Sequence, residues 1–134
     1  GVRLVGSEMC IRDSDSTWAV QHVLASGIRV LSYSGRRDFI CNFLGNAAWI
    51  DELVWSSEQG FRKQAPLEDW FVPGRRERAG QFRHYGNLTY VVIEEAGHFA
   101  PLDQPASLLA MFQRWIHPAP GSIGRLDPVQ LHAI

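Results

Sequence analysis

The sequence lacks the features that would tie it to nucleic acid or to a membrane. Its 134 residues hold 13 Lys and Arg against 14 Asp and Glu, so the formal net charge is −1 and no general attraction for a polyanion is expected. The one basic run, residues 75–78, is short and interrupted by Glu77, which is typical of a solvated loop. No stretch reaches the roughly 18 to 20 apolar residues that span a bilayer. We therefore predict no nucleic-acid partner and no membrane-spanning segment.

The sequence also has little of what metal centres and disulfide frameworks require. Two cysteines, Cys10 and Cys41, are present, and they form no C-x-x-C pair. The five histidines show no i, i+4 spacing of the kind that presents two ligands on one helix face. We therefore predict no structural metal. With 46% hydrophobic residues, the composition is that of one ordinary globular domain.

Apolar periodicity divides the chain into three regions. Residues 1–15 have no periodic pattern, and part of this stretch is similar to translated adapter sequence, so we interpret residues 1–15 as a non-native leader. A regular pattern begins at residue 16 and continues to residue 117. Residues 118–134 contain proline, glycine and scattered polar residues without a pattern, and they are predicted to be a loose tail.

Helix and strand signals alternate within residues 16–117, which favours an α/β fold. The first strand, residues 28–34, is apolar enough to be buried on both faces of a parallel sheet, and Gly86-Asn87 is typical of a hairpin loop. Residues 56–78 are predicted to be irregular, because two prolines and a glycine interrupt them. The other predicted elements are a helix between a Ser16 or Thr17 cap and Gly27, a helix from an Asn42 cap to about Trp55, strands at residues 81–85 and 88–93, and a last helix at residues 105–116.

An acid follows the first predicted strand, and a histidine follows the last. Asp38 lies in the loop that begins at Gly35, and His98 lies directly after Gly97. Loops beyond the carboxyl ends of adjacent strands meet at one edge of an α/β sheet, so these two side chains can touch. In nucleophilic hydrolases an aspartate orients a histidine that acts as the base. The alternative is structural: such an aspartate is commonly a turn former or helix cap, and such a histidine a hydrogen-bonded loop residue.

Two longer motifs surround these residues. They read D-F-I-C-N-x-L-G-N-x-A-W at residues 38–49 and A-G-H-x-x-P-x-D-x-P at residues 96–105. Together they closely resemble the C-terminal part of the serine carboxypeptidase family, of the carboxypeptidase Y and cathepsin A type. The resemblance runs from about residue 18 to residue 117. It implies the last strands and helices of an α/β-hydrolase fold, with a mostly parallel sheet that is incomplete in this chain.

The resemblance also implies roles for particular residues. Asp38 would be the acid and His98 the base of a catalytic triad. Ile40 and Cys41 would line the pocket for the substrate residue just before the scissile bond, and Cys41 would then be a free thiol. Phe99 would face the released C-terminal residue, where the family usually has methionine. The implied substrate is the C-terminus of a peptide, the implied partner is the missing N-terminal part of the same enzyme, and no cofactor is implied.

The family travels the secretory route, so the resemblance implies a vacuolar, lysosomal or secreted protein. Asn87-Leu88-Thr89 is an N-glycosylation sequon in the predicted hairpin turn, which makes Asn87 a glycosylation candidate. Asp103 is expected to cap the helix that begins at Pro105 rather than to act as a second catalytic acid.

The sequence departs from the family pattern in ways that bear on activity. No G-x-S-x-G nucleophile elbow occurs, so we expect the chain to lack the triad serine and to be inactive alone. Arg36 and Arg37 precede Asp38 where the family usually reads G-D-x-D; a guanidinium close to the Asp38 carboxylate would favour its ionised form. Three alternatives stay open: an acyltransferase of the same family, an esterase fragment of another α/β-hydrolase, and a truncated product without catalytic function.

Overall fold

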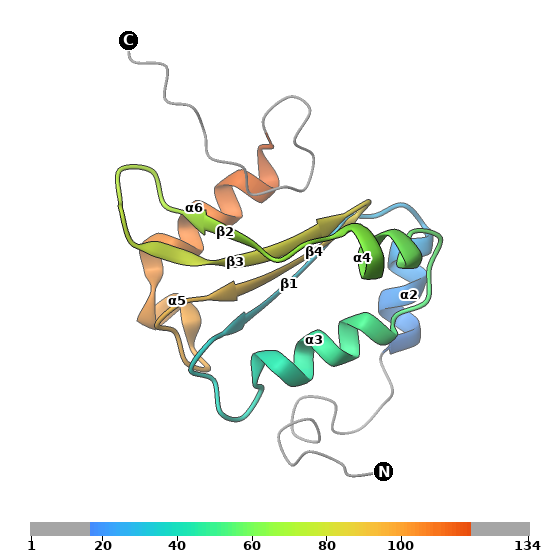
Figure 1. Cartoon of the computed structure of the whole chain (residues 1–134), viewed down its shortest axis with the longest axis horizontal. Helices are drawn as coiled ribbons and strands as arrows, with labels where there is room; N and C mark the ends of the chain where they lie inside the picture. Colours follow the sequence, from blue (N-terminus) through green and yellow to red (C-terminus); the bar gives the residue numbers. More distant parts are fainter. Residues whose placement is uncertain (1–16, 119–134) are drawn as a thin grey trace.

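The computed structural model describes residues 17–118, in which four strands form a mixed sheet (Figure 1). Their order is β1-β4-β3-β2. β1 pairs with β4 in parallel, whereas β4 with β3 and β3 with β2 are antiparallel. The strands span Val30–Gly35 (β1), Glu68–Phe71 (β2), Arg78–Tyr85 (β3) and Leu88–Ile93 (β4).

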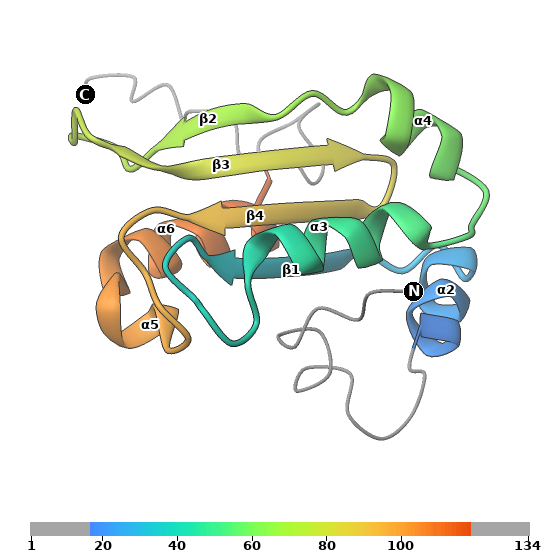
Figure 2. The same ribbon diagram turned by 60° about the horizontal axis from the view of Figure 1, so that its bottom comes forward.

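Helices cover both faces of this sheet (Figure 2). One face carries α6, and the opposite face carries α3 and α4, with α2 near the start of β1. None of the described helices is long and apolar enough to cross a membrane. The helices span Thr17–Ala25 (α2), Phe43–Glu52 (α3), Glu58–Gln64 (α4), Ala100–Asp103 (α5) and Pro105–Ile116 (α6).

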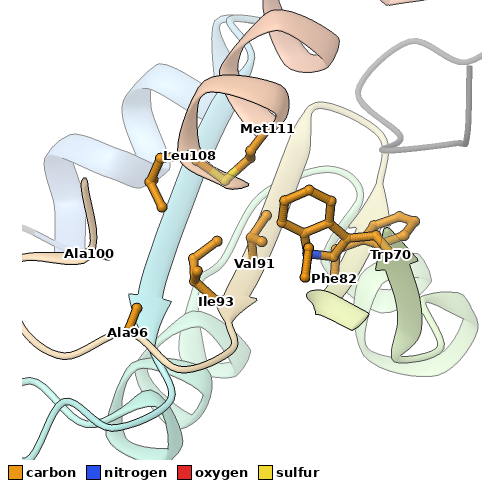
Figure 3. Close-up of a cluster of buried hydrophobic side chains, with 9 residues drawn as sticks. Trp70, Phe82, Val91, Ile93, Ala96, Ala100, Leu108 and Met111 are labelled. Carbon is orange, nitrogen blue, oxygen red and sulfur yellow. The ribbon is translucent and has the colours of Figure 1, made fainter. Parts of the chain in front are cut away.

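β4 supplies the centre of the core, because every one of its residues is buried. Val91 and Ile93 point towards Leu108 and Met111 of α6 (Figure 3). The alternate residues of β4 contribute to a second cluster on the other face, formed with residues of α2, α3 and α4. A strand with two buried faces accounts for the nearly continuous apolar run that predicted it.

β1 differs from its prediction. It begins two residues later than expected and is partly exposed, with Tyr33 open to solvent, although burial on both faces was predicted. The reason lies in the sheet: among the described residues, no strand pairs with the side of β1 away from β4. The apolar pattern of β1 is that of a central strand, but it lies at an edge of the sheet in this chain.

Several local signals are confirmed. Asn42 is the N-cap of α3, where its side-chain oxygen accepts a hydrogen bond of 2.8 Å from the backbone N–H of Gly45. Gly86 has a positive φ of 60° in the turn between β3 and β4, and Pro105 opens α6. α3 ends at Glu52 rather than near Trp55, because the backbone is already extended at the next residue.

The prediction that residues 56–78 are irregular is wrong, since α4 and β2 form within them. Tertiary contacts hold both elements. In α4, Phe61 is fully buried, and the guanidinium of Arg83 in β3 lies 4.4 Å from the centre of its ring. In β2, Trp70 is buried against the same core as α6. Such contacts override the interrupting prolines, which lie just outside the two elements.

Gly35, the last residue of β1, permits a close backbone approach. A Cβ atom there would lie 2.3 Å from the carbonyl oxygens of both Ala96 and Gly97. The backbone ladder also continues past the strand, because the N–H of Arg37 donates to the carbonyl of Ala96 at 2.8 Å. The loop after β1 and the loop after β4 are therefore held together by the backbone itself.

We predict that Gly35→Ala lowers the free energy of unfolding of the chain by about 1–3 kcal/mol, because the new methyl group overlaps two carbonyl oxygens. Urea unfolding of the purified chain measures this change. Gly45→Ala is the matched control: its Cβ would meet its nearest atom at 3.4 Å inside α3, so it should leave stability unchanged or raise it by up to about 1 kcal/mol. Equal stability of Gly35→Ala and the unmodified chain would contradict the prediction.

Candidate active site

Asp38 and His98 meet where β1 and β4 end, as the order of strands and loops predicts. Although 60 positions separate them, His98 Nδ1 lies 3.0 Å from Asp38 Oδ2. In the tautomer with the proton on Nδ1, the imidazole donates to the carboxylate. Figure 1 shows the two loops that carry them at the same end of the sheet.

The carboxylate of Asp38 is fixed by its own loop. Its Oδ1 atom accepts hydrogen bonds of 2.9 Å from the backbone N–H groups of Ile40 and Cys41. Asp38 is only 7% exposed, so a buried carboxylate is satisfied on one oxygen by the backbone and on the other by His98. Asp38 therefore forms a turn, as the structural interpretation predicts, and it also binds the imidazole of His98; its catalytic role stays a prediction.

Asn46, at the end of the first turn of α3, connects the loop that carries Asp38, the aspartate loop, to the sheet. Its amide donates hydrogen bonds of 3.0 Å to Ser34 Oγ and to the carbonyl of Cys41. The hydroxyl of Tyr90 in β4 donates to the carbonyl of Phe43 at 2.7 Å, and burial raises the pKa of Tyr90, which keeps this donor protonated. Both ends of α3's first turn are thus anchored to neighbouring strands.

Asp103 holds the loop that carries His98, the histidine loop, because its Oδ2 atom accepts a 2.7 Å hydrogen bond from the N–H of Gly97. The prediction that Asp103 caps the helix beginning at Pro105 is wrong. Gln104 occupies the N-cap position of α6 and makes no side-chain cap, because Asp103 lies inside the preceding short helix α5 and points back to the loop.

The two edges of the His98 ring have different environments. Nδ1 is bound to Asp38, whereas the side chain as a whole is 48% exposed and Nε2 has no partner among the described residues. Phe99 packs edge-on to the imidazole, with ring centroids 5.4 Å apart, and is 71% exposed. The ring is therefore oriented on one side and open on the other, which is the geometry a general base requires.

A small cavity of about 190 Å³ adjoins this pair. Of the residues expected to bind substrate, Cys41 lines the cavity, whereas Ile40 and Phe99 lie outside its lining and are exposed. The cavity is lined by Tyr33, Ser34, Gly35, Asp38, Cys41, Asn46, His98 and Ala100.

The prediction that Cys41 is a free thiol is wrong, because Cys41 is disulfide-bonded in the structure. Cys10, the second cysteine of the sequence, lies outside the described residues. Ligand atoms of Cys41, Asp38 and His98 lie within 4.8 Å of one another. This donor set does not suit a metal, since a disulfide sulfur offers no thiolate and both carboxylate oxygens accept other hydrogen bonds.

Neither arginine beside Asp38 approaches its carboxylate. Arg36 pairs with Glu94 at 2.8 Å, and Arg37 pairs with Glu95. The charge stabilisation considered for Asp38 required one of these guanidinium groups to face it, so that condition is not met. The two arginines bind instead the acids that follow β4.

The sequon residue Asn87 has a structural role in the folded chain. Its side-chain amide donates hydrogen bonds of 2.8 and 2.9 Å to the carbonyls of Leu24 and Ile28. These bonds join the β3–β4 turn to the connection between α2 and β1. A glycan on this nitrogen would remove at least one of the two donors, and glycosylation of Asn87 stays a prediction.

Sequence reasoning did not identify the roles that three residues have in shaping the site: Gly35, Asn46 and Asp103. Asn46 and Asp103 lie inside the two quoted motifs, but nothing in the spacing says which atoms they bind. Gly35 had a signal, because a glycine at the end of a buried strand is typical of a close backbone approach.

Comparison with known proteins identifies the relatives of this chain. The sequence model of the serine carboxypeptidase family matches residues 9–118. Carboxypeptidase Y of Komagataella phaffii is 50% identical over 97 residues, which are 72% of this chain and 18% of that protein. Carboxypeptidase Y homolog A of Neurospora crassa is 39% identical over 127 residues, covering 87% of this chain and 23% of that protein.

The fold has a solved counterpart. The prohormone-processing carboxypeptidase Kex1 of Saccharomyces cerevisiae is similar with a TM-score of 0.62 and 32% sequence identity, over 75% of this chain and 21% of that one. The described residues therefore form a partial sheet of the α/β-hydrolase fold, as predicted. The chain spans only about a fifth of the length of these relatives.

We predict that Asp103→Ala speeds hydrogen exchange at the Gly97 amide about fivefold, because the loss of its acceptor removes about 1 kcal/mol of local protection. Exchange measured by NMR on the purified chain tests this. Asp103→Asn is the control, since its side-chain oxygen can still accept the bond and exchange should stay close to that of the unmodified chain. Unchanged exchange in Asp103→Ala would show that the bond does not hold the histidine loop.

Proposed function

Because the chain belongs to the serine carboxypeptidase family, we propose that it is the C-terminal segment of a serine-type carboxypeptidase and supplies two members of its catalytic triad, Asp38 and His98. The enzyme would release C-terminal amino acids from peptides through an acyl-enzyme. One observation supports this above all others: His98 Nδ1 is bound to a buried carboxylate while Nε2 remains open.

This geometry supports a stepwise mechanism. His98 Nε2 removes the proton of a serine hydroxyl as its oxygen attacks the scissile carbonyl, and it then donates that proton to the departing amine. Asp38 keeps the proton of the neutral ring on Nδ1 and stabilises the imidazolium that forms. A water molecule then hydrolyses the acyl-enzyme with His98 acting again as the base. Three hydrogen bonds hold the buried Asp38 carboxylate, two from backbone N–H groups and one from His98, and they would keep the pair aligned through both steps.

The nucleophile is expected from another part of the enzyme. Ser34 is the serine that lines the cavity beside His98, but it is buried and its Oγ atom is already bonded to Asn46 and Tyr90. Among the described residues, no serine is hydrogen-bonded to His98. The chain alone is therefore proposed to be inactive, because histidine without an aligned nucleophile and oxyanion hole loses nearly all of the catalysed rate.

Substrate contacts are proposed on both sides of His98. Cys41, at the cavity, and the neighbouring Ile40 would contact the residue before the scissile bond. Phe99, which is exposed and packs against the imidazole edge, would contact the released residue and favour an apolar one. The substrate would thus lie across the open edge of the ring.

The partner of this chain is proposed to be the N-terminal part of the same enzyme. Within residues 17–118 no strand pairs with the side of β1 away from β4, and a further strand there would extend the sheet next to the site. Family membership also supports a place in the secretory pathway, with a vacuolar, lysosomal or secreted destination.

We predict that Asp38→Asn in the full-length enzyme lowers kcat by about four orders of magnitude with little change in KM, because an amide in place of the carboxylate favours the wrong imidazole tautomer. Hydrolysis of a blocked dipeptide measures both constants. Asp51→Asn is the control, because Asp51 lies near the C-terminal end of α3, where it pairs with Arg83 of β3, and the substitution should leave kcat unchanged. Acyl transfer to an alcohol without hydrolysis in the unmodified enzyme would favour the acyltransferase alternative.

A serine-directed fluorophosphonate should label the full-length enzyme and leave the purified 134-residue chain unlabelled. The expected difference follows from the proposal that the nucleophile aligned with His98 comes from another part of the enzyme. Mass spectrometry of both proteins after equal exposure gives the result. Stoichiometric labelling of the chain at any serine, abolished by His98→Gln, would contradict the proposed inactivity of the chain.

A further inference from the structure

Arg36 follows β1 directly, and its guanidinium joins three other elements. Nε lies 2.8 Å from the carboxylate of Glu94 at the end of β4, and Nη2 donates to Gln81 Oε1 in β3 at 2.5 Å. The guanidinium carbon also lies 5.0 Å from the centre of the Phe43 ring at the start of α3. The side chain of Arg36 therefore connects the end of β1 with the end of β4, with β3 and with the start of α3, next to the site.

These contacts span the loops that carry the catalytic pair. The aspartate loop begins at Arg36 and ends at Phe43, so the cation–π contact joins its two ends. Glu94 begins the histidine loop, so the ion pair joins the starts of the two loops. We propose that Arg36 is a positioning residue that acts through Glu94 and Phe43 to keep Asp38 and His98 at hydrogen-bond distance. This inference rests on the proposed function, although the distance itself can be tested without activity.

The Arg36–Glu94 ion pair is more buried than the neighbouring Arg37–Glu95 ion pair. The side chains of Arg36 and Glu94 are 29% and 14% exposed, whereas those of Arg37 and Glu95 are 67% and 57% exposed. An exposed ion pair contributes little because water and salt screen it, while a partly buried pair with additional hydrogen bonds holds a fixed geometry. Arg37 is consequently a matched control. It lies in the aspartate loop, as Arg36 does, and its partner Glu95 lies in the histidine loop, as Glu94 does.

Glu94 is also held from its other side. Arg78 in β3 binds it at 2.7 Å and binds Asp69 in β2 at 3.1 Å. The acid thus has a fixed position from which it can orient Arg36. When Arg36 is neutralised, Glu94 keeps Arg78 as a partner, so no half-buried charge is left unpaired and the variant should still fold.

The test uses Arg36→Gln, Arg36→Lys and Arg37→Gln with two measurements. Long-range ¹H–¹⁵N spectra of the histidine rings in the labelled chain, with His98 assigned through His98→Gln, report how fully the proton occupies Nδ1. Steady-state hydrolysis of a blocked dipeptide by the full-length enzyme gives kcat and KM. We expect Arg36→Gln to reduce the Nδ1–H population and to lower kcat about tenfold to a hundredfold, as a displacement near 1 Å would. KM should stay within about twofold.

Arg36→Lys should restore most of the Nδ1–H signal and of kcat, because it keeps the charge beside Glu94, and Arg37→Gln should change neither quantity. Equal behaviour of Arg36→Gln and Arg37→Gln would overturn the proposal, and so would a failure of Arg36→Lys to restore the signal. The proposed function fails separately: an unmodified full-length protein without peptidase activity, but with the Arg36-dependent Nδ1–H signal in the chain, would refute the carboxypeptidase assignment and leave the positioning role of Arg36 standing.

Discussion

Gly35 lies so close to the carbonyl oxygens of Ala96 and Gly97 that no side chain fits between them. This contact brings the ends of β1 and β4 together, and the rest of the site depends on it. Asp38 reaches His98 because the two loops leave the sheet at the same place, and the parallel pairing of the two strands fixes that place to within a residue. The proximity of Asp38 and His98 is therefore a consequence of strand register and of the hydrogen bonds within each loop.

Near this contact the same kind of interaction occurs in both loops: a side-chain carboxylate accepts hydrogen bonds from backbone N–H groups close to it in the chain. Asp38 accepts the N–H groups of Ile40 and Cys41, and Asp103 accepts the N–H of Gly97. Asn46 then ties the aspartate loop to β1. Each loop is thus held by its own hydrogen bonds, and the half-exposed His98 is oriented through Nδ1 while its Nε2 atom has no partner within residues 17–118.

The parts of the fold and of the site that could be predicted from the sequence are those whose signals are local. Asn42 as a cap, Gly86 in a hairpin turn and Pro105 at a helix start are each decided by a few neighbouring residues, and all were predicted. α4 and β2 were not, because Phe61 and Trp70 are held by long-range contacts that no local pattern reveals. Asp38 and His98 could be paired because they follow strands. The partners of Asp103 and the disulfide state of Cys41 depend on atoms brought together only by folding.

We propose that Asp38 and His98 complete a triad whose serine belongs to another part of the enzyme. A crystal structure of the full-length protein with an organophosphonate bound to its nucleophile tests this claim most directly. We expect the modified serine to lie within hydrogen-bond reach of His98 Nε2, with Asp38 still bound to Nδ1. A labelled serine remote from His98, or a His98 ring turned away from Asp38, would contradict it.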